Sequence, residues 1–255
     1  PYTSSAASDV YKRQVLIAAG GTGGHVFPGV ALAKQLQSDG FEVHWVGTNA
    51  GLESRNVPAQ GIVFHALAMQ GFRGKQWHRR LMAIIDLLRS WLKLIGMMRA
   101  LKIRCVVGMG GFASAPAGFA AKTCRVPLLL QEQNAVMGTT NSVLSRMAKK
   151  IFTGFPYSPA SNKMVYSGNP LRADILAASA NASTDQANQS ECNILILGGS
   201  LGASVLNELL PQVLAELAQQ VKPLTIRVHH QTGVNDIDAV RSAYAALACE
   251  VEAVA

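Results

Sequence analysis

The chain has 255 residues, of which 49% are apolar and only 15% are charged, and it carries a net charge of +8. This length corresponds to roughly two domains or one large α/β domain, and the apolar content excludes a disordered chain. Residues 70–104 contain nine basic side chains and one acidic side chain, so this segment carries the whole surplus. The remaining residues are balanced in charge. With 15% charged and 6% aromatic residues, the composition is not that of a highly charged tail that binds RNA or DNA.

The four cysteines, at positions 105, 124, 192 and 249, are widely spaced and form no Cys-x-x-Cys pair. This spacing argues against a zinc site or a disulfide framework and fits a reducing cytoplasm. We expect neither a metal nor a cofactor. Residues 1–13 are polar and lack helix or strand periodicity, so we interpret them as a non-native or disordered leader.

Short apolar runs alternate with helical patterns along the first part of the chain, which predicts a parallel sheet with crossover helices. The predicted strands are 14–19, 42–46, 62–67, 105–108, 127–131 and 150–153. The predicted helices are 25–38, 77–101, 114–123 and 139–149.

A second strand, glycine turn and helix begin after a polar stretch, which predicts a second domain. Strands at 193–197 and 224–228 alternate with helices at 203–219 and 236–247, and the last residues resemble the opening of another strand. We predict an α/β fold with two Rossmann-like domains, at 14–172 and 193–255, joined by a linker at 173–192. The second is shorter than the roughly 100–150 residues of a whole domain, so we expect it to be incomplete.

Glycine-rich turns follow three of the predicted strands, at 20–25, 108–112 and 198–203. Such turns let the backbone approach a phosphate, and the following helix start points its N–H groups at the anion. The first turn lacks the dinucleotide pattern because Val26 stands where a small residue is needed, and it lacks the P-loop lysine, which His25 replaces. We therefore predict phosphate-rich ligands other than NAD or ATP, meeting between the two domains.

Five motifs carry a specific resemblance: AGGTGGHVFPG at 19–29, GMGG at 108–111, QEQN at 131–134, GNPLR at 168–172 and GGSLGA at 198–203. In this order they resemble the MurG family of bacterial N-acetylglucosaminyltransferases. The resemblance implies a GT-B architecture and metal-independent, inverting transfer of GlcNAc from UDP-GlcNAc to the C4 hydroxyl of MurNAc in lipid I. The products would be lipid II and UDP, in peptidoglycan synthesis.

The resemblance also implies roles for residues of these motifs. His25 would be the general base, since a free imidazole titrates near neutral pH, or alternatively a structural residue of the helix start. The residues implied to bind UDP-GlcNAc are Thr22, Gly23, Gly24, Asn134, Arg172 and Ser200. The implied acceptor and diphosphate loops contain Gly108, Gly110, Gly111, Glu132, Gly198, Gly199 and Gly202.

Two departures from the family pattern affect these expectations. Leu201 stands where the family has Gln, which puts a donor contact in doubt. The family's remaining donor contacts would lie beyond Ala255, so we expect the chain alone to be inactive. The alternatives are another GT-B glycosyltransferase, a UDP-sugar epimerase, or a non-catalytic module that binds a lipid diphosphate.

Residues 81–98 are mostly apolar and are flanked by the basic residues of the charged segment, but they are too short and too charged to span a membrane. Leu81, Ile84, Ile85, Leu88, Trp91, Leu92, Ile95 and Met98 share one helical face, which we expect to cover the sheet. The segment as a whole predicts an interfacial contact with anionic lipid, the alternative being a core helix with a solvated basic rim. The predicted contact residues are Phe72, Arg73, Lys75, Trp77, Arg79, Arg80 and Trp91.

This contact, together with the family resemblance, implies a peripheral protein on the cytoplasmic face of the bacterial plasma membrane. The partners implied are UDP-GlcNAc, lipid I and anionic inner-membrane lipids. Proteins of cell-wall synthesis and division are further implied partners.

Overall fold

The computed structural model describes residues 13–69, 77–181, 191–199, 202–220, 225–245 and 250–254. The chain forms two compact units, Pro1–Ala180 and Asn181–Ala255, and each is described by itself.

The first unit contains a seven-stranded parallel sheet in the order β3-β2-β1-β4-β5-β6-β7. The chain starts in β1 near the middle, moves to β2 and β3 on one side, and returns to β4 on the other. The switch point therefore lies between β1 and β4, the place where open α/β sheets bind ligands. The strands are β1 Gln14–Ala19, β2 Glu42–Thr48, β3 Val63–Leu67, β4 Cys105–Gly110, β5 Leu128–Glu132, β6 Lys150–Thr153 and β7 Met164–Tyr166.

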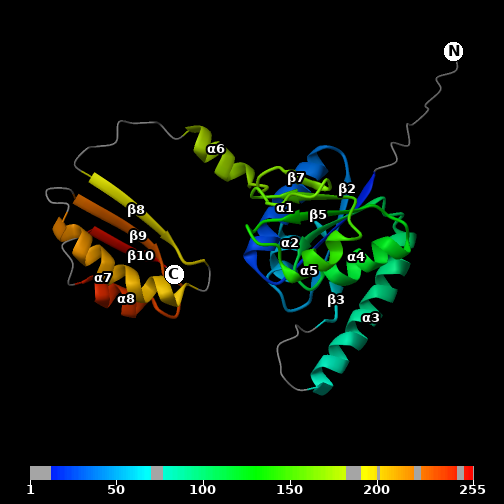
Figure 1. The fold of residues 1–255 in the computed structure, drawn as a ribbon, viewed down its shortest axis with the longest axis horizontal. Helices are drawn as coiled ribbons and strands as arrows, with labels where there is room; N and C mark the ends of the chain where they lie inside the picture. Colours follow the sequence, from blue (N-terminus) through cyan, green and yellow to red (C-terminus); the bar gives the residue numbers. More distant parts are fainter. Residues whose placement is uncertain are drawn as a thin grey trace, which may run out of the picture. The chain divides into compact units, whose positions relative to one another are not determined.

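Helices cover both faces of this sheet (Figure 1), which explains why its strands are continuous apolar runs. On one face α1 and α2 pack on Ile17 and Trp45, and on the other α3, α4 and α5 pack on Leu16 and Leu130. Neighbouring residues of β1 thus belong to opposite cores, as strand geometry requires. The helices are α1 Gly23–Ser38, α2 Glu53–Ala59, α3 Trp77–Ala100, α4 Ser114–Thr123, α5 Thr139–Ser145 and α6 Ala173–Asn181.

The second unit begins the same pattern again with a three-stranded parallel sheet in the order β10-β9-β8. Its core gathers Ile196, Leu214, Ile226, Val228, Val240 and Tyr244. The predicted third strand is present as β10. The elements are β8 Glu191–Leu197, α7 Ser204–Gln220, β9 Thr225–Gln231, α8 Ile237–Tyr244 and β10 Glu250–Val254.

The predicted elements of both units are present, but three further elements were not predicted. These are α2, β7 and α6, of which α6 occupies the first part of the stretch predicted as a linker. The helix predicted over 139–149 ends earlier, at Ser145. Helix α2 lacks apolar periodicity and contains Pro58, and tertiary hydrogen bonds of its first residue, Glu53, hold it in place.

The inner face predicted for α3 is partly wrong. Trp91, Ile95 and Met98 pack against the core, whereas Ile84, Ile85, Leu88 and Leu92 are exposed. Among the side chains of this helix that the structure describes, those buried are Ala83, Ser90, Leu94 and Met98, and Met82 is exposed as well. The helix is turned because its close contact is with the small-residue helix α4, where Trp91 Nε1 donates to Thr123 Oγ1 at 3.2 Å. An apolar stripe is left on the outside of α3.

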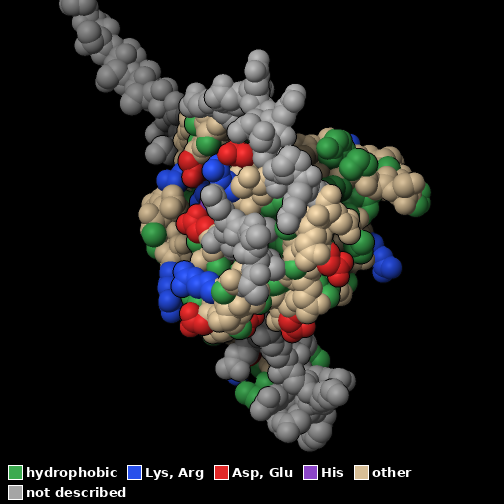
Figure 2. All heavy atoms as spheres, turned by 90° about the vertical axis from the view of Figure 1, so that its left-hand side faces the viewer, with side chains coloured by type: hydrophobic (Ala, Val, Ile, Leu, Met, Phe, Trp, Pro, Cys, Tyr) green, Lys and Arg blue, Asp and Glu red, His purple; other side chains and the backbone are tan. Residues whose placement is uncertain are grey.

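Part of the surplus of basic side chains lies on α3 and just after it, near this apolar stripe. Arg89, Lys93, Arg99, Lys102 and Arg104 are all exposed. On the face shown in Figure 2, by contrast, acidic and basic side chains are interspersed. No helix in the described ranges is long and apolar enough to cross a membrane.

Candidate functional site

The first two glycine turns meet at the switch point of the sheet. The turn after β1 leads into α1, and the turn after β4 leads into α4. Gly111 has a φ of +77°, and its α-carbon lies so close to the Gly20 carbonyl that a Cβ would overlap it. Ser114 ties the second turn to β1, since its Oγ accepts from Gly110 N at 3.1 Å and lies 2.6 Å from the Ala18 carbonyl. Glycine at 111 is thus required by both conformation and space.

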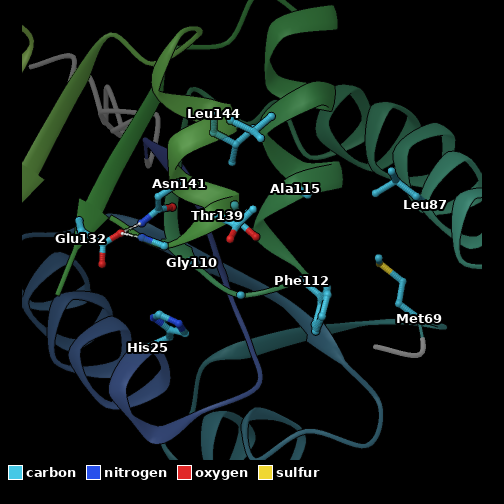
Figure 3. Close-up of a pocket in the computed structure, with 14 residues that line it drawn as sticks. His25, Met69, Leu87, Gly110, Phe112, Ala115, Glu132, Thr139, Asn141 and Leu144 are labelled. Atoms are coloured by element: carbon cyan, nitrogen blue, oxygen red, sulfur yellow. Dashed lines mark hydrogen bonds between the residues drawn. The ribbon is translucent and has the colours of Figure 1, made fainter. Parts of the chain in front are cut away.

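His25 lies in the first turn of α1, and its ring is directed toward Gly110 (Figure 3). Its Nδ1 is 2.8 Å from Gln133 Oε1, whereas Nε2 has no hydrogen-bond partner among the described residues. A Cβ added at Gly110, whose φ is +101°, would lie 2.9 Å from the ring carbon Cε1. The imidazole is therefore held at one nitrogen and has its other nitrogen free for a ligand.

Glu132, the last residue of β5, is fully buried and organises the other wall. Its Oε1 accepts from the backbone and side-chain nitrogens of Asn134 at 3.1 and 2.9 Å. Its Oε2 accepts from Gly138 N at 3.0 Å and from Asn141 Nδ2 at 2.9 Å. With four hydrogen bonds inside the protein, this carboxylate shapes the loop after β5.

A pocket of about 550 Å³ opens between these walls. Polar groups lie at one end of it and apolar side chains at the other, as Figure 3 shows. Such a cavity suits a ligand with one polar and one apolar part. Its lining residues are His25, Met69, Leu87, Gly110, Gly111, Phe112, Ala115, Glu132, Gly138, Thr139, Thr140, Asn141, Val143 and Leu144.

Glu53 supports the first glycine turn from behind and was not found by sequence reasoning. Its fully buried carboxylate accepts from Gly21 N at 3.1 Å and from the backbone and hydroxyl of Thr48 at 2.8 and 2.7 Å. The signal in the sequence was weak, because a single Glu in a segment without periodicity resembles any surface residue.

The structure places the other predicted residues at different distances from this pocket. Thr22 caps α1 and accepts at its carbonyl from His25 N at 3.1 Å, with Gly23 and Gly24 in the same turn. Asn134 is exposed beside the pocket, and its carbonyl accepts from the Tyr157 hydroxyl at 2.9 Å.

Two predicted residues lie elsewhere. Gly108 lies inside β4 rather than in a turn, where Leu130 leaves no room for a side chain. Arg172 pairs with Asp174 at 3.3 Å and lines a separate hollow of about 760 Å³ beside α1. Its guanidinium is thus not brought to the pocket that contains His25.

The third glycine turn belongs to the second unit. Gly199 and Gly202 both have a φ of +76°, and Gly198 N donates to the Gln231 carbonyl at 3.2 Å. Asn207, in the first turn of α7, donates to the Thr232 carbonyl at 3.0 Å and to Asp236 at 2.8 Å. The turn therefore opens α7 as predicted, while Ser200 and Leu201 lie outside the described residues.

Several predicted membrane contacts also lie outside the described part of the chain: Phe72, Arg73 and Lys75, and the side chains of Trp77, Arg79 and Arg80. Trp91 is half-buried against α4. Within the described residues, no group of three or more His, Cys, Asp or Glu side chains could hold a metal ion.

Together these features define the class of domain to which the first unit belongs. A doubly wound parallel sheet, two glycine turns at its switch point and an imidazole that lines a pocket there form a Rossmann-like domain. The second unit starts another such domain.

Comparison with known proteins identifies the family. Residues 15–153 match the glycosyltransferase family 28 N-terminal domain and residues 193–255 match its C-terminal domain. The chain belongs to glycosyltransferase family 28. Its fold is GT-B, with two Rossmann-like domains of which the second is partial.

Among curated proteins, the chain is similar to enzymes named UDP-N-acetylglucosamine–N-acetylmuramyl-(pentapeptide) pyrophosphoryl-undecaprenol N-acetylglucosamine transferase. Identity is 40% with that of Pseudomonas paraeruginosa, over 94% of this chain and 66% of the relative. It is 43% with that of Ectopseudomonas mendocina, over 93% of this chain and 65% of the relative. The chain thus spans just under two thirds of the length of these relatives.

The chain is also similar to solved structures. The crystal structure of Acinetobacter baumannii MurG matches with a TM-score of 0.70 and 33% identity, over 95% of this chain and 65% of that one. The UDP-GlcNAc 2-epimerase from Neisseria meningitidis has a TM-score of 0.59 at 13% identity, over 94% of this chain and 71% of that one, and shares the fold alone. The resemblance to the MurG family inferred from the motifs is confirmed.

Proposed function

We propose that this chain is the acceptor domain and the beginning of the donor domain of an inverting N-acetylglucosaminyltransferase. Its substrates would be UDP-GlcNAc and lipid I, and its products lipid II and UDP, in peptidoglycan synthesis. The names of the curated relatives support the reaction. The observation that carries the proposal is the position of His25, which lines a pocket at the switch point of the sheet and whose Nε2 has no hydrogen-bond partner among the described residues.

The proposed mechanism uses His25 as general base. Its Nε2 takes the proton of the MurNAc C4 hydroxyl while that oxygen bonds to C1 of GlcNAc and the bond from C1 to the UDP oxygen breaks. The electron pair of the broken bond leaves on the diphosphate, so backbone N–H groups and helix N-termini near it would stabilise the developing charge.

The polar and apolar ends of the pocket support separate binding sites for the two parts of the acceptor. We assign the diphosphate of lipid I to the turn at Gly110 and Gly111, and the start of its lipid chain to the apolar end near Met69 and Leu87. Thr22, Gly23, Gly24 and Asn134 would border the sugars. The roles predicted for Arg172 and Ser200 toward UDP-GlcNAc stay proposals.

A transferase assay tests this function. Because the chain spans under two thirds of its relatives, it is joined to the part of the Pseudomonas paraeruginosa enzyme that it does not match. We expect UDP release that depends on a lipid I analogue, and a fall of about 10²–10⁴-fold in kcat for His25→Ala. Absence of lipid I-dependent release from the joined protein contradicts the reaction, and an unchanged kcat in His25→Ala removes His25 as base.

We further propose that the outside of α3 contacts anionic lipid and places the protein on the inner face of the plasma membrane. The exposed apolar side chains Met82, Ile84, Leu88 and Leu92 support this, with Arg89 beside them. Apolar burial and attraction to anionic headgroups act together at such a surface. This location would bring the protein near those of cell-wall synthesis and division.

A further inference from the structure

We propose that Gln133 is a positioning residue that fixes the tautomer of His25, through a relay of side-chain amides ending at Asn169. The proposal concerns which ring nitrogen carries the proton in the neutral imidazole. It deepens the proposed function, since only an unprotonated Nε2 accepts a proton from a sugar hydroxyl.

The relay connects three amides and one imidazole. Asn169 Oδ1 accepts from Gln131 Nε2 at 3.0 Å, Gln131 Oε1 accepts from Gln133 Nε2, and Gln133 Oε1 lies 2.8 Å from His25 Nδ1. Gln131 and Gln133 are buried, being 3% and 7% exposed. Buried amides must satisfy their hydrogen bonds internally, so each fixes the orientation of the next.

Two backbone carbonyls set the direction of the relay. Gln133 Nε2 also donates to the Met109 carbonyl at 3.0 Å, and Asn169 Nδ2 donates to the Gln133 carbonyl at 3.2 Å. A carbonyl oxygen only accepts, so in each amide the nitrogen must be the atom that faces it. Gln133 Nε2 donates one hydrogen to the Met109 carbonyl and the other to Gln131 Oε1, so the oxygen of Gln133 is the atom that faces His25.

The orientation of Gln133 determines the protonation of the imidazole. Its Oε1 can only accept, so His25 Nδ1 must carry the hydrogen, and Nε2 of the neutral ring must carry the lone pair. Nε2 is the nitrogen without a partner among the described residues, in a pocket-lining side chain. The relay thus presents the basic nitrogen to the pocket before any ligand binds.

Nitrogen-15 NMR of the imidazoles in the 255-residue chain tests this directly, because the shifts of Nδ1 and Nε2 show which one is protonated. Spectra are recorded near pH ~8.5, where imidazoles are neutral. The His25 signals are those that vanish in His25→Ala. We expect the Nδ1–H form in the unmodified chain, and a predominant Nε2–H form there overturns the proposal whatever the variants do.

Three substitutions to Met distinguish the effect of the relay on the His25 tautomer from the general effects of a substitution. Gln133→Met removes the acceptor and should lower the ratio of Nδ1–H to Nε2–H about fivefold, the equivalent of one hydrogen bond of ~1 kcal/mol. Gln131→Met should lower it less, since the Met109 carbonyl still orients Gln133. Gln35→Met, at an exposed position of α1, should leave it unchanged. An unchanged ratio in a folded Gln133→Met chain contradicts the proposal.

The same variants in the joined protein show whether the tautomer matters for transfer. We expect Gln133→Met to lower kcat about fivefold while KM for both substrates stays within about twofold, because the substitution changes the base and not the binding walls. A shifted tautomer with unchanged kcat, together with an active His25→Ala, contradicts the proposed base but leaves the tautomer assignment standing. An unshifted tautomer with an inactive His25→Ala contradicts the positioning role alone.

Discussion

The ring of His25 lies directly against the α-carbon of Gly110, with no room for a side chain between them. One residue comes from the turn after β1 and the other from the end of β4, so this contact joins the two strands at the switch point. It ties the position of the proposed base to a glycine distant in sequence.

Gly110→Ala should therefore displace the imidazole as well as strain the backbone. A Cβ 2.9 Å from Cε1 requires a shift of the ring, and the φ of +101° disfavours any side chain. We expect a loss of unfolding free energy of about 1–3 kcal/mol and of most transferase activity in the joined protein. Urea unfolding and UDP release measure the two effects.

Gly40→Ala is the matched control, because Gly40 has a φ of +84° and open space around it. Gly40→Ala should lower the unfolding free energy through backbone strain but leave the transferase activity of the joined protein unchanged. Equal activity in the two variants would mean that the contact with His25 does not position the ring.

Glu53→Gln should loosen the first glycine turn. The carboxylate accepts three hydrogen bonds, and a Gln would turn an NH2 group toward either Gly21 N or Thr48. A buried donor left facing a donor costs about 1–3 kcal/mol, so urea unfolding should show a loss of this size. Glu216→Gln, at an exposed position of α7, should change the unfolding free energy little. A Glu53→Gln chain as stable as the parent would contradict the supporting role.

His65, in β3, should make the first unit less stable in mild acid. Burial, followed by the charges of His44 and Lys93, lowers the pKa of His65 below 6.5. As the pH falls through 6.5, the unfolded chain therefore binds a proton that the folded chain does not, and the unfolding free energy decreases. We expect the urea midpoint to fall between about pH 7.5 and 5.5.

His65→Gln should reduce this pH dependence. His230 in the second unit, whose pKa is lowered by burial, acts in the same direction but is common to both chains, so the difference between them reports on His65. The same slope in both chains would contradict this explanation.

Replacing exposed apolar residues of α3 should weaken the proposed binding to anionic vesicles. Leu88 and Leu92 are 50% and 61% exposed, so changing either to Glu should leave the fold intact while removing about 1–2 kcal/mol of apolar contact. Arg89→Gln should weaken binding to anionic vesicles about fivefold and leave binding to neutral ones unchanged. Vesicle sedimentation measures both, with Val213→Glu on α7 as control. Equal binding by the parent chain and all four variants would contradict the proposed surface.

Much of the fold was predictable because burial on both faces makes each strand of a parallel sheet a continuous apolar run. The strands at Gln14–Ala19 and Lys150–Thr153 and the helix at Ser114–Thr123 were predicted with their observed bounds. The buried face of α3 could not be predicted in this way. Apolar residues surround most of this helix, and only its packing against α4 selects which of them are buried.

The α/β class, the glycine turns and the family could all be predicted from the sequence, because they depend on local patterns and on motifs that stand in order along the chain. Tertiary structure alone decided that Glu53 braces the first turn and that Gln131, Gln133 and Asn169 form a relay to His25. These residues are distant in sequence or unremarkable in type, and only the parallel sheet brings the carboxyl ends of β1, β2, β5 and β7, which they follow, to one edge. Hydrogen bonds between such residues leave no periodicity for sequence reasoning to find.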